Sequence, residues 1–346
     1  MNDRSPTGDR AAATWRRVTI QGGDSFRIDD GEDSLLRGAL RAGIGMPHEC
    51  SVGGCGACRF DLVSGHVATL WDAAPGLTAR DRQRGKHLAC QSFPLDDCTI
   101  RVRCDDAYRP PVAPRQRIAT LLGRRDLTPE MSEIVLQVPG DATFLPGQYA
   151  LLYPEHVTGA RAYSMSNLPG ADATWSFVIR RVAGGAGSVA LLERYRPGDT
   201  LKVDGPYGHA YLRQDSGRDV VCIAGGSGLG PMLSIAGAAI ARDSARRVRF
   251  FAGLRSQGDL GAVALVDALA APRLATTVVL SSPEPGAPWA GASGLVHAEV
   301  ERSLPAPLAQ YDFYFAGPAP MIDAVQEMLM IRHKVPFEQI HYDRFT

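Results

Sequence analysis

The first third of the chain alternates apolar and polar positions in the manner of short strands around one helix. Residues 15–29 alternate on both sides of a glycine turn, and further strands are expected at 59–63 and 97–102. Leucine and alanine recur at helical spacing over 32–42, after which a glycine stops the helix. This pattern predicts a ubiquitin-like α+β domain over residues 15–106.

Two different patterns follow a proline-rich tether at residues 107–115. Residues 116–215 contain short apolar segments between turn signals, which predicts a small antiparallel β-barrel. Over residues 216–346 strands alternate with helices, which predicts a doubly wound parallel sheet with ligands at the carboxyl ends of its strands. The strands are expected at 219–224, 248–252, 275–280, 311–316 and the tail, with helices ending at 242 and spanning 260–270, 295–303 and 321–331. The chain is therefore expected to be multidomain.

The composition narrows the classes of function. Lysine plus arginine and aspartate plus glutamate both number 37 among 346 residues, so no charge excess favours nucleic acid. No apolar run approaches the roughly 18 residues that span a bilayer, and seven cysteines in so long a chain do not form a disulfide framework. Residues 1–14 lack the apolar core of a signal peptide and are expected to form a disordered leader. These features predict a soluble, cytoplasmic protein with neither membrane nor nucleic acid as a partner.

Four cysteines have the spacing of an iron–sulfur site. Cys50, Cys55 and Cys58 form a glycine-rich C-x4-C-x2-C loop, and Cys90 follows 32 positions later. This is the spacing of a plant-type [2Fe–2S] centre, in which four thiolates hold two irons, and the glycines permit close approach of the backbone. The alternatives are four unrelated thiols or a zinc site. Zinc ribbons usually pair two C-x2-C units, and this chain has only one.

Two segments of the predicted barrel contain residues suited to cofactor binding. Residues 161–167, RAYSMSN, place an arginine, an aromatic ring and a serine where they can bind a phosphate, a flat ring and a ring nitrogen together. Residues 184–190, GGAGSVA, open a helical stretch whose free N–H groups suit a pyrophosphate. Either piece alone can also be an ordinary barrel turn.

A third glycine-rich stretch, GGSGLGP at 225–231, follows the first strand of the predicted parallel sheet. Its place at the carboxyl end of a strand favours dinucleotide binding, and Pro231 suits the first position of a helix. The stretch departs from the G-x-G-x-x-G fingerprint because Pro231 occupies the place of the last glycine.

Together these motifs resemble the reductase components of bacterial multicomponent oxygenases. In that family a plant-type ferredoxin domain precedes a flavin barrel and a nicotinamide domain of the ferredoxin–NADP reductase type. The motifs that stand in the family's order are the cysteine loop, FLPGQY at 144–149, RAYS at 161–164, DGPYG at 204–208, GGSGLGP and FAGP at 315–318. The segments LWDAAPGL, LACQ and KVPFEQIHYDRF are especially similar to toluene 4-monooxygenase reductases. The resemblance covers about residues 15–346.

The resemblance implies roles for individual residues. The four cysteines are expected to ligate the cluster, and Arg161 is expected to contact the FAD pyrophosphate together with the backbone N–H groups of Gly187 and Ser188. Tyr163 is expected to lie against the isoalloxazine ring and Ser164 near its reactive nitrogen. The catalytic residues are expected to be Ser164, Tyr163 and Phe345. The cofactor-binding residues are expected to be Arg161, Ala162, Tyr163, Ser164, Gly187, Ser188, Gly226, Ser227, Gly228, Gly230, Asp259, Gly317 and Pro318.

At one position a competing role stays open, and at another the chain departs from the family pattern. The tail, YDRFT at 342–346, is expected to end near the flavin face with Phe345 as the stacking residue, and core packing is the competing role for Phe345. Ala316 stands where the family usually has a cysteine beside the nicotinamide, and Ala319 replaces the second proline of that motif. Because a thiol there can help to position the nicotinamide, the departure favours slower hydride transfer, and no chemical role is assigned to Ala316.

The expected nucleotide is NADH. Asp259 follows the second strand of the predicted sheet, where a carboxylate hydrogen-bonds a ribose diol and repels a 2′-phosphate. Arg255, four positions earlier, is able to do the opposite. Similar family members carry Asp-Leu at this place and use NADH.

The implied function is the transfer of electrons from NADH through FAD and the [2Fe–2S] cluster to a Rieske-type ferredoxin. That ferredoxin serves a di-iron hydroxylase acting on an aromatic hydrocarbon. The alternatives are direct delivery to a phenol- or alkene-type hydroxylase or to an aromatic-ring dioxygenase. A redox-sensing iron–sulfur module is a more distant alternative, because sensing needs no nicotinamide site. A monomer is expected.

Overall fold

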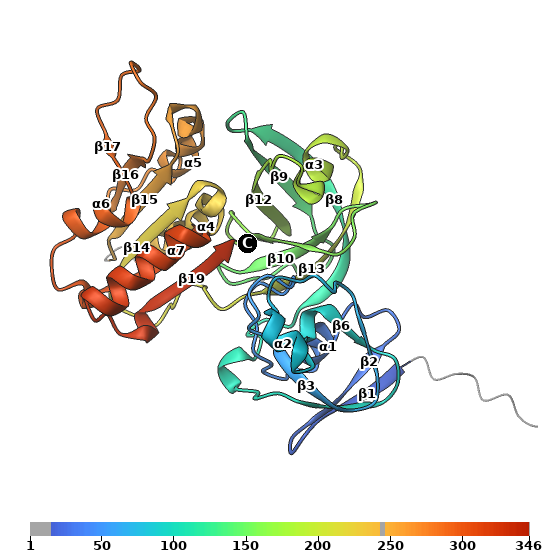
Figure 1. Ribbon diagram of the computed structural model, residues 1–346. Helices are drawn as coiled ribbons and strands as arrows, with labels where there is room; N and C mark the ends of the chain where they lie inside the picture. The colour runs from blue at the N-terminus through green and yellow to red at the C-terminus, as the bar shows by residue number, and fades with distance from the viewer. Residues whose placement is uncertain (1–14, 243–245, 346) are drawn as a thin grey trace, which may run out of the picture. The chain divides into compact units, whose positions relative to one another are not determined.

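A computed structural model describes residues 15–242 and 246–345. The predicted leader at 1–14 and the last residue, Thr346, lie outside the described residues. The chain divides into two compact units, the first ending at Arg109 and the second starting at Pro110. This division falls within the predicted tether. The first unit carries the cysteine loop, and the second carries the glycine-rich motifs (Figure 1).

The first unit is a five-stranded sheet with the order β2-β1-β7-β3-β5, packed against one main helix. Strands β1 and β7 are parallel, and the other neighbours are antiparallel. This arrangement confirms the predicted ubiquitin-like α+β domain. The elements are β1 (Trp15–Ile20), β2 (Ser25–Asp29), α1 (Leu35–Arg41), β3 (Arg59–Ser64), β4 (Val67–Thr69), α2 (Ala79–Gln83), β5 (Lys86–Leu88), β6 (Ser92–Pro94) and β7 (Cys98–Arg101).

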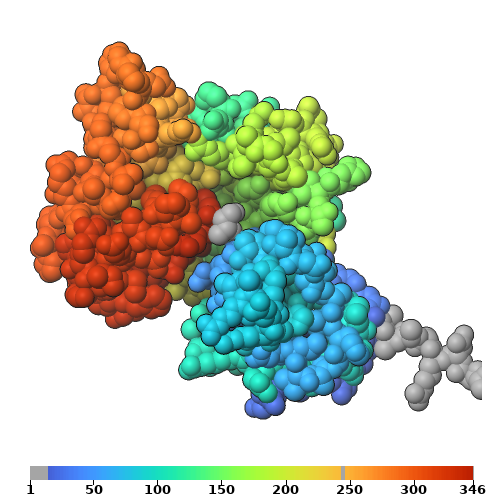
Figure 2. All heavy atoms as spheres, in the orientation of Figure 1, coloured from blue at the N-terminus to red at the C-terminus, as the bar shows by residue number. Residues whose placement is uncertain are grey.

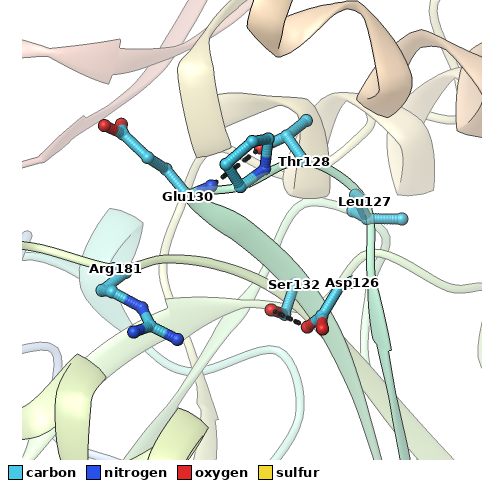
Figure 3. Close-up of a pocket in the computed structure, with 7 residues that line it drawn as sticks. Asp126, Leu127, Thr128, Glu130, Ser132 and Arg181 are labelled. Carbon is cyan, nitrogen blue, oxygen red and sulfur yellow. Dashed lines mark hydrogen bonds between the residues drawn. The ribbon is translucent and has the colours of Figure 1, made fainter.

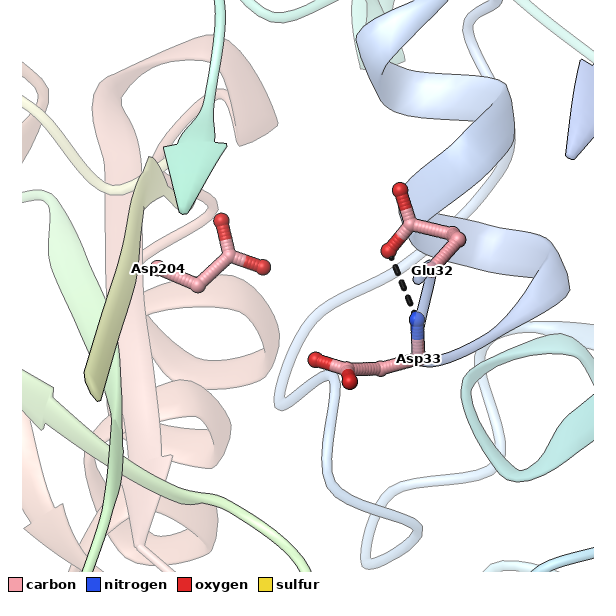
Figure 4. A group of neighbouring side chains, drawn as sticks. All are labelled: Glu32, Asp33 and Asp204. Carbon is pink, nitrogen blue, oxygen red and sulfur yellow. Dashed lines mark hydrogen bonds between the residues drawn. The ribbon is translucent and has the colours of Figure 1, made fainter. Parts of the chain in front are cut away.

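The predicted helix over 32–42 starts three residues later than expected, at Leu35. Ser34 caps it, because the Ser34 side chain accepts the backbone N–H of Arg37. Glu32 shapes the turn before the cap: its carboxylate accepts the N–H of Asp33 at 2.9 Å (Figure 4) and the guanidinium of Arg41 at 2.5 Å. The polar residues at 32–34 therefore form the helix entry rather than its first turn.

The second unit begins with a six-stranded antiparallel sheet in the order β11-β10-β13-β8-β9-β12. Its buried side chains, centred on Trp175 and Phe177, form a separate hydrophobic core. The predicted antiparallel barrel is thereby confirmed. Its elements are β8 (Arg115–Asp126), β9 (Met131–Gln137), β10 (Tyr149–Tyr153), β11 (Arg161–Ser164), β12 (Thr174–Arg180), α3 (Ala186–Glu193) and β13 (Thr200–Tyr207).

The rest of the second unit is a parallel sheet in the order β17-β16-β15-β14-β18-β19. Helices α4 and α5 contribute to one core and α6 and α7 to the other (Figure 1), so the sheet is doubly wound as predicted. The strands are β14 (Asp219–Gly225), β15 (Val248–Leu254), β16 (Leu274–Leu280), β17 (Ala292–Ser293), β18 (Tyr311–Pro318) and β19 (Ile340–Phe345). The helices are α4 (Leu229–Arg242), α5 (Ala264–Asp267), α6 (Val296–Ser303) and α7 (Ala319–Gln326), which a π-helical turn at Glu327–Arg332 extends.

The prediction of one helix that packs on this sheet was wrong. Residues 260–270 were expected to form a single α-helix, but a 3-10 segment at Gln257–Val263 precedes a four-residue α5. Gly258 and Gly261 weaken a regular helix there. A Cβ on Gly261 would lie only 2.3 Å from the carbonyl oxygen of Leu127 in the barrel. The close approach of the barrel turn therefore requires glycine where a helix would prefer a side chain.

Candidate functional site

The cysteine loop brings its four thiols together as two pairs. Cys50 Sγ accepts the backbone N–H groups of Gly54 and Cys55, each at 3.3 Å. Hydrogen bonding from the Cys55 thiol, with these N–H groups, lowers the pKa of Cys50 to about 5. The Cys58 and Cys90 sulfurs lie 3.3 Å apart. Two neighbouring pairs of thiols form a donor set suited to two irons, so the residues fit a [2Fe–2S] cluster.

A buried arginine supports the cysteine loop from α1. Arg37 is 3% exposed, and its guanidinium donates to the carbonyl oxygens of Ser51 at 3.2 Å and Cys90 at 3.3 Å. Its positive charge stands beside both chain segments that supply sulfur ligands and stabilises thiolates there. The sequence gives no sign of this role for Arg37, because a single arginine among the leucines of a predicted helix suggests only a solvent-facing position.

The two flavin motifs of the barrel lie against each other. Arg161 is on β11, and a Cβ on Gly187 in the first turn of α3 would come 2.6 Å from Cγ of Arg161. The first backbone bond of α3 runs from Val189 N–H to the oxygen of Gly185, which leaves the N–H groups of residues 186–188 ahead of the hydrogen-bonded helix. A guanidinium beside free N–H groups fits a pyrophosphate.

Two further predicted residues hold this part of the barrel in shape. Ala162 pairs with Leu151 in the β10–β11 ladder. The Ser188 hydroxyl accepts the N–H of Val182 at 3.1 Å, so its side chain closes the loop before α3. The contact of the Ser188 backbone N–H with a pyrophosphate stays a prediction.

Tyr163 and Ser164 complete β11 and point to different environments. Tyr163 packs against the barrel core, and burial raises its pKa to about 12, which keeps the phenol neutral. The Ser164 hydroxyl donates to the carboxylate of Asp343 on β19 at 3.2 Å. Asp343 was expected to lie in a tail near the flavin, with no role of its own. The only signal was a carboxylate two residues before the predicted stacking ring.

The glycine loop after β14 lies against the end of β18. A Cβ on Gly228 would come 2.0 Å from the carbonyl oxygen of Ala316, so this approach requires glycine. Gly230, at the start of α4, faces the barrel, and a Cβ there would lie 3.6 Å from the carbonyl oxygen of Ser164. The structure therefore brings the predicted nicotinamide loop and the predicted flavin motif together. The loop residues Gly226, Ser227 and Gly228 share this place with Gly317 and Pro318.

Phe345 and Ala316 lie on neighbouring strands of the parallel sheet. Phe345 pairs in register with Pro318, is half-buried and packs against the core on the α4 side of the sheet. Ala316 is fully buried and pairs with Asp343. The contacts of Phe345 are those of the competing role in core packing, and its stacking on a flavin stays a prediction.

Asp259 lies in the 3-10 segment that follows β15. It is 6% exposed, and its carboxylate accepts the N–H of Arg255 at 3.1 Å. Arg180, the last residue of β12, places its Nη2 at 3.8 Å from Asp259 and its Nη1 at 3.2 Å from where a Cβ on Gly226 would stand. Asp259 thus shapes the turn after β15. Its predicted hydrogen bond to a ribose stays a prediction.

Arg180 is held in place by the turn between β8 and β9. Its Nε donates to the carboxylate of Glu130 at 3.0 Å. The hydroxyl of Thr128 fixes this turn by accepting the N–H of Glu130 at 3.2 Å (Figure 3). The small cleft beside it is lined by Asp126, Leu127, Thr128, Pro129, Glu130, Ser132 and Arg181. The place of Arg180 beside the glycine loop could not be predicted, because the arginine pair at the end of a strand belongs to no motif.

Three family models match the chain in the order that the motifs gave. The 2Fe-2S iron-sulfur cluster binding domain matches residues 18–95. The oxidoreductase FAD-binding domain matches residues 119–211, and the oxidoreductase NAD-binding domain matches residues 222–327.

Relatives match over nearly the whole chain. The ferredoxin–NAD(P)(+) reductase CarAd of Metapseudomonas resinovorans is 40% identical over 90% of this chain and 94% of its own length. The ferredoxin–NAD(+) reductase component of the alkene monooxygenase system of Xanthobacter autotrophicus is 40% identical over 93% of this chain and 100% of its own length. The chain belongs to the reductase components of multicomponent oxygenases. This reductase is thus an electron-transfer oxidoreductase with [2Fe–2S], FAD and a nicotinamide nucleotide as its cofactors.

Solved structures agree with this assignment of the reductase. The ferredoxin reductase in carbazole 1,9a-dioxygenase has a TM-score of 0.88 and 36% identity, covering 96% of this chain and 98% of that one. The Amycolatopsis cytochrome P450 reductase GcoB has a TM-score of 0.82 and 29% identity, covering 96% and 99%. The xylene/toluene monooxygenase electron transfer component of Pseudomonas putida is 33% identical over 95% of this chain and 93% of its own length. The specific likeness to toluene 4-monooxygenase reductases stays a prediction.

None of the helices in the described part of the reductase combines the length and the apolarity that a membrane span needs.

Proposed function

We propose that the reductase passes electrons from NADH through FAD and its [2Fe–2S] cluster to a Rieske-type ferredoxin of a di-iron aromatic monooxygenase. The observation that carries the proposal is the meeting of the flavin motif and the nicotinamide loop around Ser164, Gly230 and Ala316, in a chain that also carries a cluster loop. Bound FAD accepts a hydride and releases electrons one at a time, which a one-electron cluster requires.

The residues of the second unit position the two nucleotides for this chemistry. Arg161 and the N–H groups at the start of α3 bind the anionic part of FAD, which fixes the ring near Tyr163. The glycine loop lets a dinucleotide approach the ends of β14 and β18, beside Ser164. Orientation of two reactants in one cleft is the main contribution that a protein makes to hydride transfer between cofactors.

We propose NADH rather than NADPH as the donor. Asp259 lies in the 3-10 segment after β15, with its buried carboxylate fixed by the N–H of Arg255, and a negative charge there disfavours a 2′-phosphate. The test adds stoichiometric NADH or NADPH to the anaerobic protein and follows the flavin band. Rapid bleaching by NADH and slow bleaching by NADPH are expected. An equal response to both nucleotides would refute the role of Asp259.

The identity of the acceptor is the second element of the proposal. Relatives include reductase components named for phenol 2-monooxygenase, at 31% identity, and for a naphthalene dioxygenase system, at 33% identity, so direct transfer to a hydroxylase or to a dioxygenase component is the competing proposal. The test is stopped-flow mixing of the NADH-reduced protein with a purified Rieske ferredoxin or a purified di-iron hydroxylase. Reduction of the hydroxylase alone would overturn the Rieske acceptor.

The thiolates of the cluster loop favour a reducing compartment, and we propose a cytoplasmic monomer on this ground and on the family resemblance. A sensor role is disfavoured because the nicotinamide domain has no use in one. Multiple turnovers with NADH and an artificial acceptor distinguish the reductase from a sensor.

A further inference from the structure

An exposed apolar pair lies beside the cysteine loop of the first unit. Leu70 and Trp71 are 48% and 45% exposed. The N–H of Leu70 donates to the carbonyl oxygen of Gln91, the residue after Cys90, at 2.8 Å. Trp71 Cε3 lies 3.1 Å from where a Cβ on Gly53 would stand, in the loop between the first two cluster cysteines. The pair therefore contacts both chain segments that supply the sulfur ligands.

Helix α2 is fastened to the segment that carries this pair. The guanidinium of Arg82 donates three hydrogen bonds to that segment, to the carbonyl oxygens of Asp72, Ala74 and Leu77. Residues 79–86 contain four basic side chains and one acidic one. The acid, Asp81, is already engaged, since it closes the capping box of α2 and pairs with Arg59 at 3.3 Å. Residues 79–86 therefore carry a net positive charge. Figure 2 draws this part of the chain in light blue, the colour of its residue numbers.

Two of these basic residues do not hold the segment together through a side-chain contact of the kind that Arg82 makes. Arg80 and Arg84 are exposed, and across residues 15–242 and 246–345 neither guanidinium has a carboxylate partner. These unpaired arginines lie in helix α2 and at its C-cap, and Arg82 joins this helix to the segment after an exposed tryptophan. Tryptophan and arginine are the residues that supply most of the binding energy of protein-binding surfaces. A surface of this sign attracts an acidic partner over long range.

We propose that Leu70, Trp71, Arg80 and Arg84 form the electron-exit surface of the reductase and dock an acidic redox protein. The inference rests on the proposed function, transfer to a protein acceptor, and adds the surface and the charge of that acceptor. One electron leaves the reduced cluster and reduces the oxidised centre of the docked protein, and no bond forms or breaks. The apolar pair excludes water beside the cluster loop, and the arginines steer the approach. Transient redox complexes use small interfaces of this kind.

The test compares two protein acceptors of opposite charge in stopped-flow mixing with the NADH-reduced holoenzyme. The anionic probe is an acidic Rieske-type ferredoxin, and the cationic probe is cytochrome c. Arg84→Glu is expected to slow reduction of the ferredoxin about tenfold at low ionic strength and not to slow reduction of cytochrome c. Trp71→Ala is expected to slow reduction of the ferredoxin about tenfold by removing the anchor.

Matched controls lie elsewhere on the same unit. Leu95→Ala removes an exposed apolar side chain at the opposite end of the β4–β6 ladder. Arg27→Glu reverses an exposed charge, paired with Asp29 at 2.5 Å, on the edge strand β2. Both are expected to match the wild type. The visible spectrum of each variant and the rate at which NADH reduces its own cluster are recorded as well.

The outcomes distinguish failure of the proposed function from failure of the exit surface. If the wild type reduces neither protein acceptor while its own cluster is reduced, the proposed function fails. If the wild type reduces the ferredoxin and both variants match it, the exit surface is refuted. If Trp71→Ala or Arg84→Glu instead slows reduction of the protein's own cluster, the surface serves the contact with the flavin unit or a second copy, and the exit role is overturned.

Discussion

The hydroxyl of Ser164 and the carboxylate of Asp343 lie 3.2 Å apart, although 179 residues separate them in the chain. The hydrogen bond joins the last residue of β11 in the barrel to β19 of the parallel sheet, where Asp343 stands in register with Ala316. It orients a serine hydroxyl at the place where the flavin motif and the nicotinamide loop meet. This hydrogen bond therefore joins the barrel and the parallel sheet within the candidate site.

This contact predicts that Ser164→Ala slows hydride transfer. Loss of the oriented hydroxyl is expected to lower the rate of flavin reduction by NADH about tenfold or more, because small errors in positioning are costly. Asp343→Asn keeps a hydrogen-bonding partner for the Ser164 hydroxyl and is expected to lower the rate of flavin reduction less. Stopped-flow bleaching of the flavin measures both. The control is Ser132→Ala, at a site away from the glycine loop. The Ser132 hydroxyl donates to the carboxylate of Asp126 at 2.7 Å (Figure 3). A Ser164→Ala rate equal to that of the control would contradict the assignment.

Removal of one cluster ligand is expected to separate the two redox units. Cys90→Ser should abolish the iron–sulfur absorbance and the transfer of electrons to protein acceptors, since a plant-type cluster needs four thiolates. The NADH-dependent reduction of ferricyanide by the flavin should remain, because the flavin motifs lie in the other unit. Iron content and the visible spectrum provide the measurement.

The matched control for the ligand change is Cys98→Ser. Cys98 is a buried thiol of β7, outside the loop and the segment that supply the four expected ligands. The variant should keep the cluster. Loss of the cluster from Cys98→Ser, or its retention in Cys90→Ser, would show that the ligand set is wrong.

Arg180 is expected to contribute to binding of the nicotinamide nucleotide. Its guanidinium stands over Gly226 and is oriented by Glu130, so it faces the loop where the pyrophosphate of a dinucleotide is expected. Arg180→Gln should raise the KM for NADH about tenfold and weaken binding of NAD+ in a titration, because a charge-assisted hydrogen bond contributes about 1.5–3 kcal/mol. The flavin spectrum should not change.

The neighbouring arginine offers a control for this change. Arg181 pairs with Glu193 at 2.8 Å on the exposed side of the barrel. Arg181→Gln should leave the KM within about twofold of the wild type, since an exposed ion pair contributes about 1 kcal/mol or less. Equal KM values in the two variants would remove Arg180 from the nucleotide site.

The sequence predicted the parts of this protein that depend on local spacing. The cysteine spacing, the RAYS motif and the glycine loop each specify a local backbone geometry, so their chemistry could be assigned before any packing was known. The alternation of strands and helices likewise specified the doubly wound sheet. The starts of the expected strands of the parallel sheet agreed to within a residue or two. Helix α1 starts later than expected because Ser34 caps it, which the apolar spacing alone did not show.

The residues that the sequence did not reveal are those whose role comes from distant contacts. Arg37, Arg180 and Asp343 each reach a motif from another element of their own unit. Asp343 lies in the tail that the sequence singled out, but its contact with Ser164 could not be read from that tail. The 3-10 segment after β15 was missed for the same reason, since the approach of Leu127 to Gly261 decides it. Tertiary contacts of this kind leave no periodicity in the sequence.

A buried histidine is expected to make the stability of the second unit depend on pH. His341 on β19 is 8% exposed and stacks on Tyr314 with ring centroids 4.8 Å apart. Burial, together with the positive charge of Arg213, lowers the pKa of His341 from 6.5 to about 4. Burial raises the pKa of Tyr314 to about 12, so the tyrosine stays neutral over the range that matters.

The sign of the effect follows from the lowered pKa. The unfolded chain binds a proton at His341 below about pH 6.5 and the folded chain only near pH 4, so stability is full above pH 6.5 and falls as the pH decreases towards 4. The loss from this residue should be roughly 3 kcal/mol at most. Thermal unfolding of the wild type and of His341→Phe, which keeps an aromatic ring against Tyr314, measures it. The wild type should lose more stability than the variant between pH 7 and pH 5, and parallel losses in the two proteins would refute the assignment.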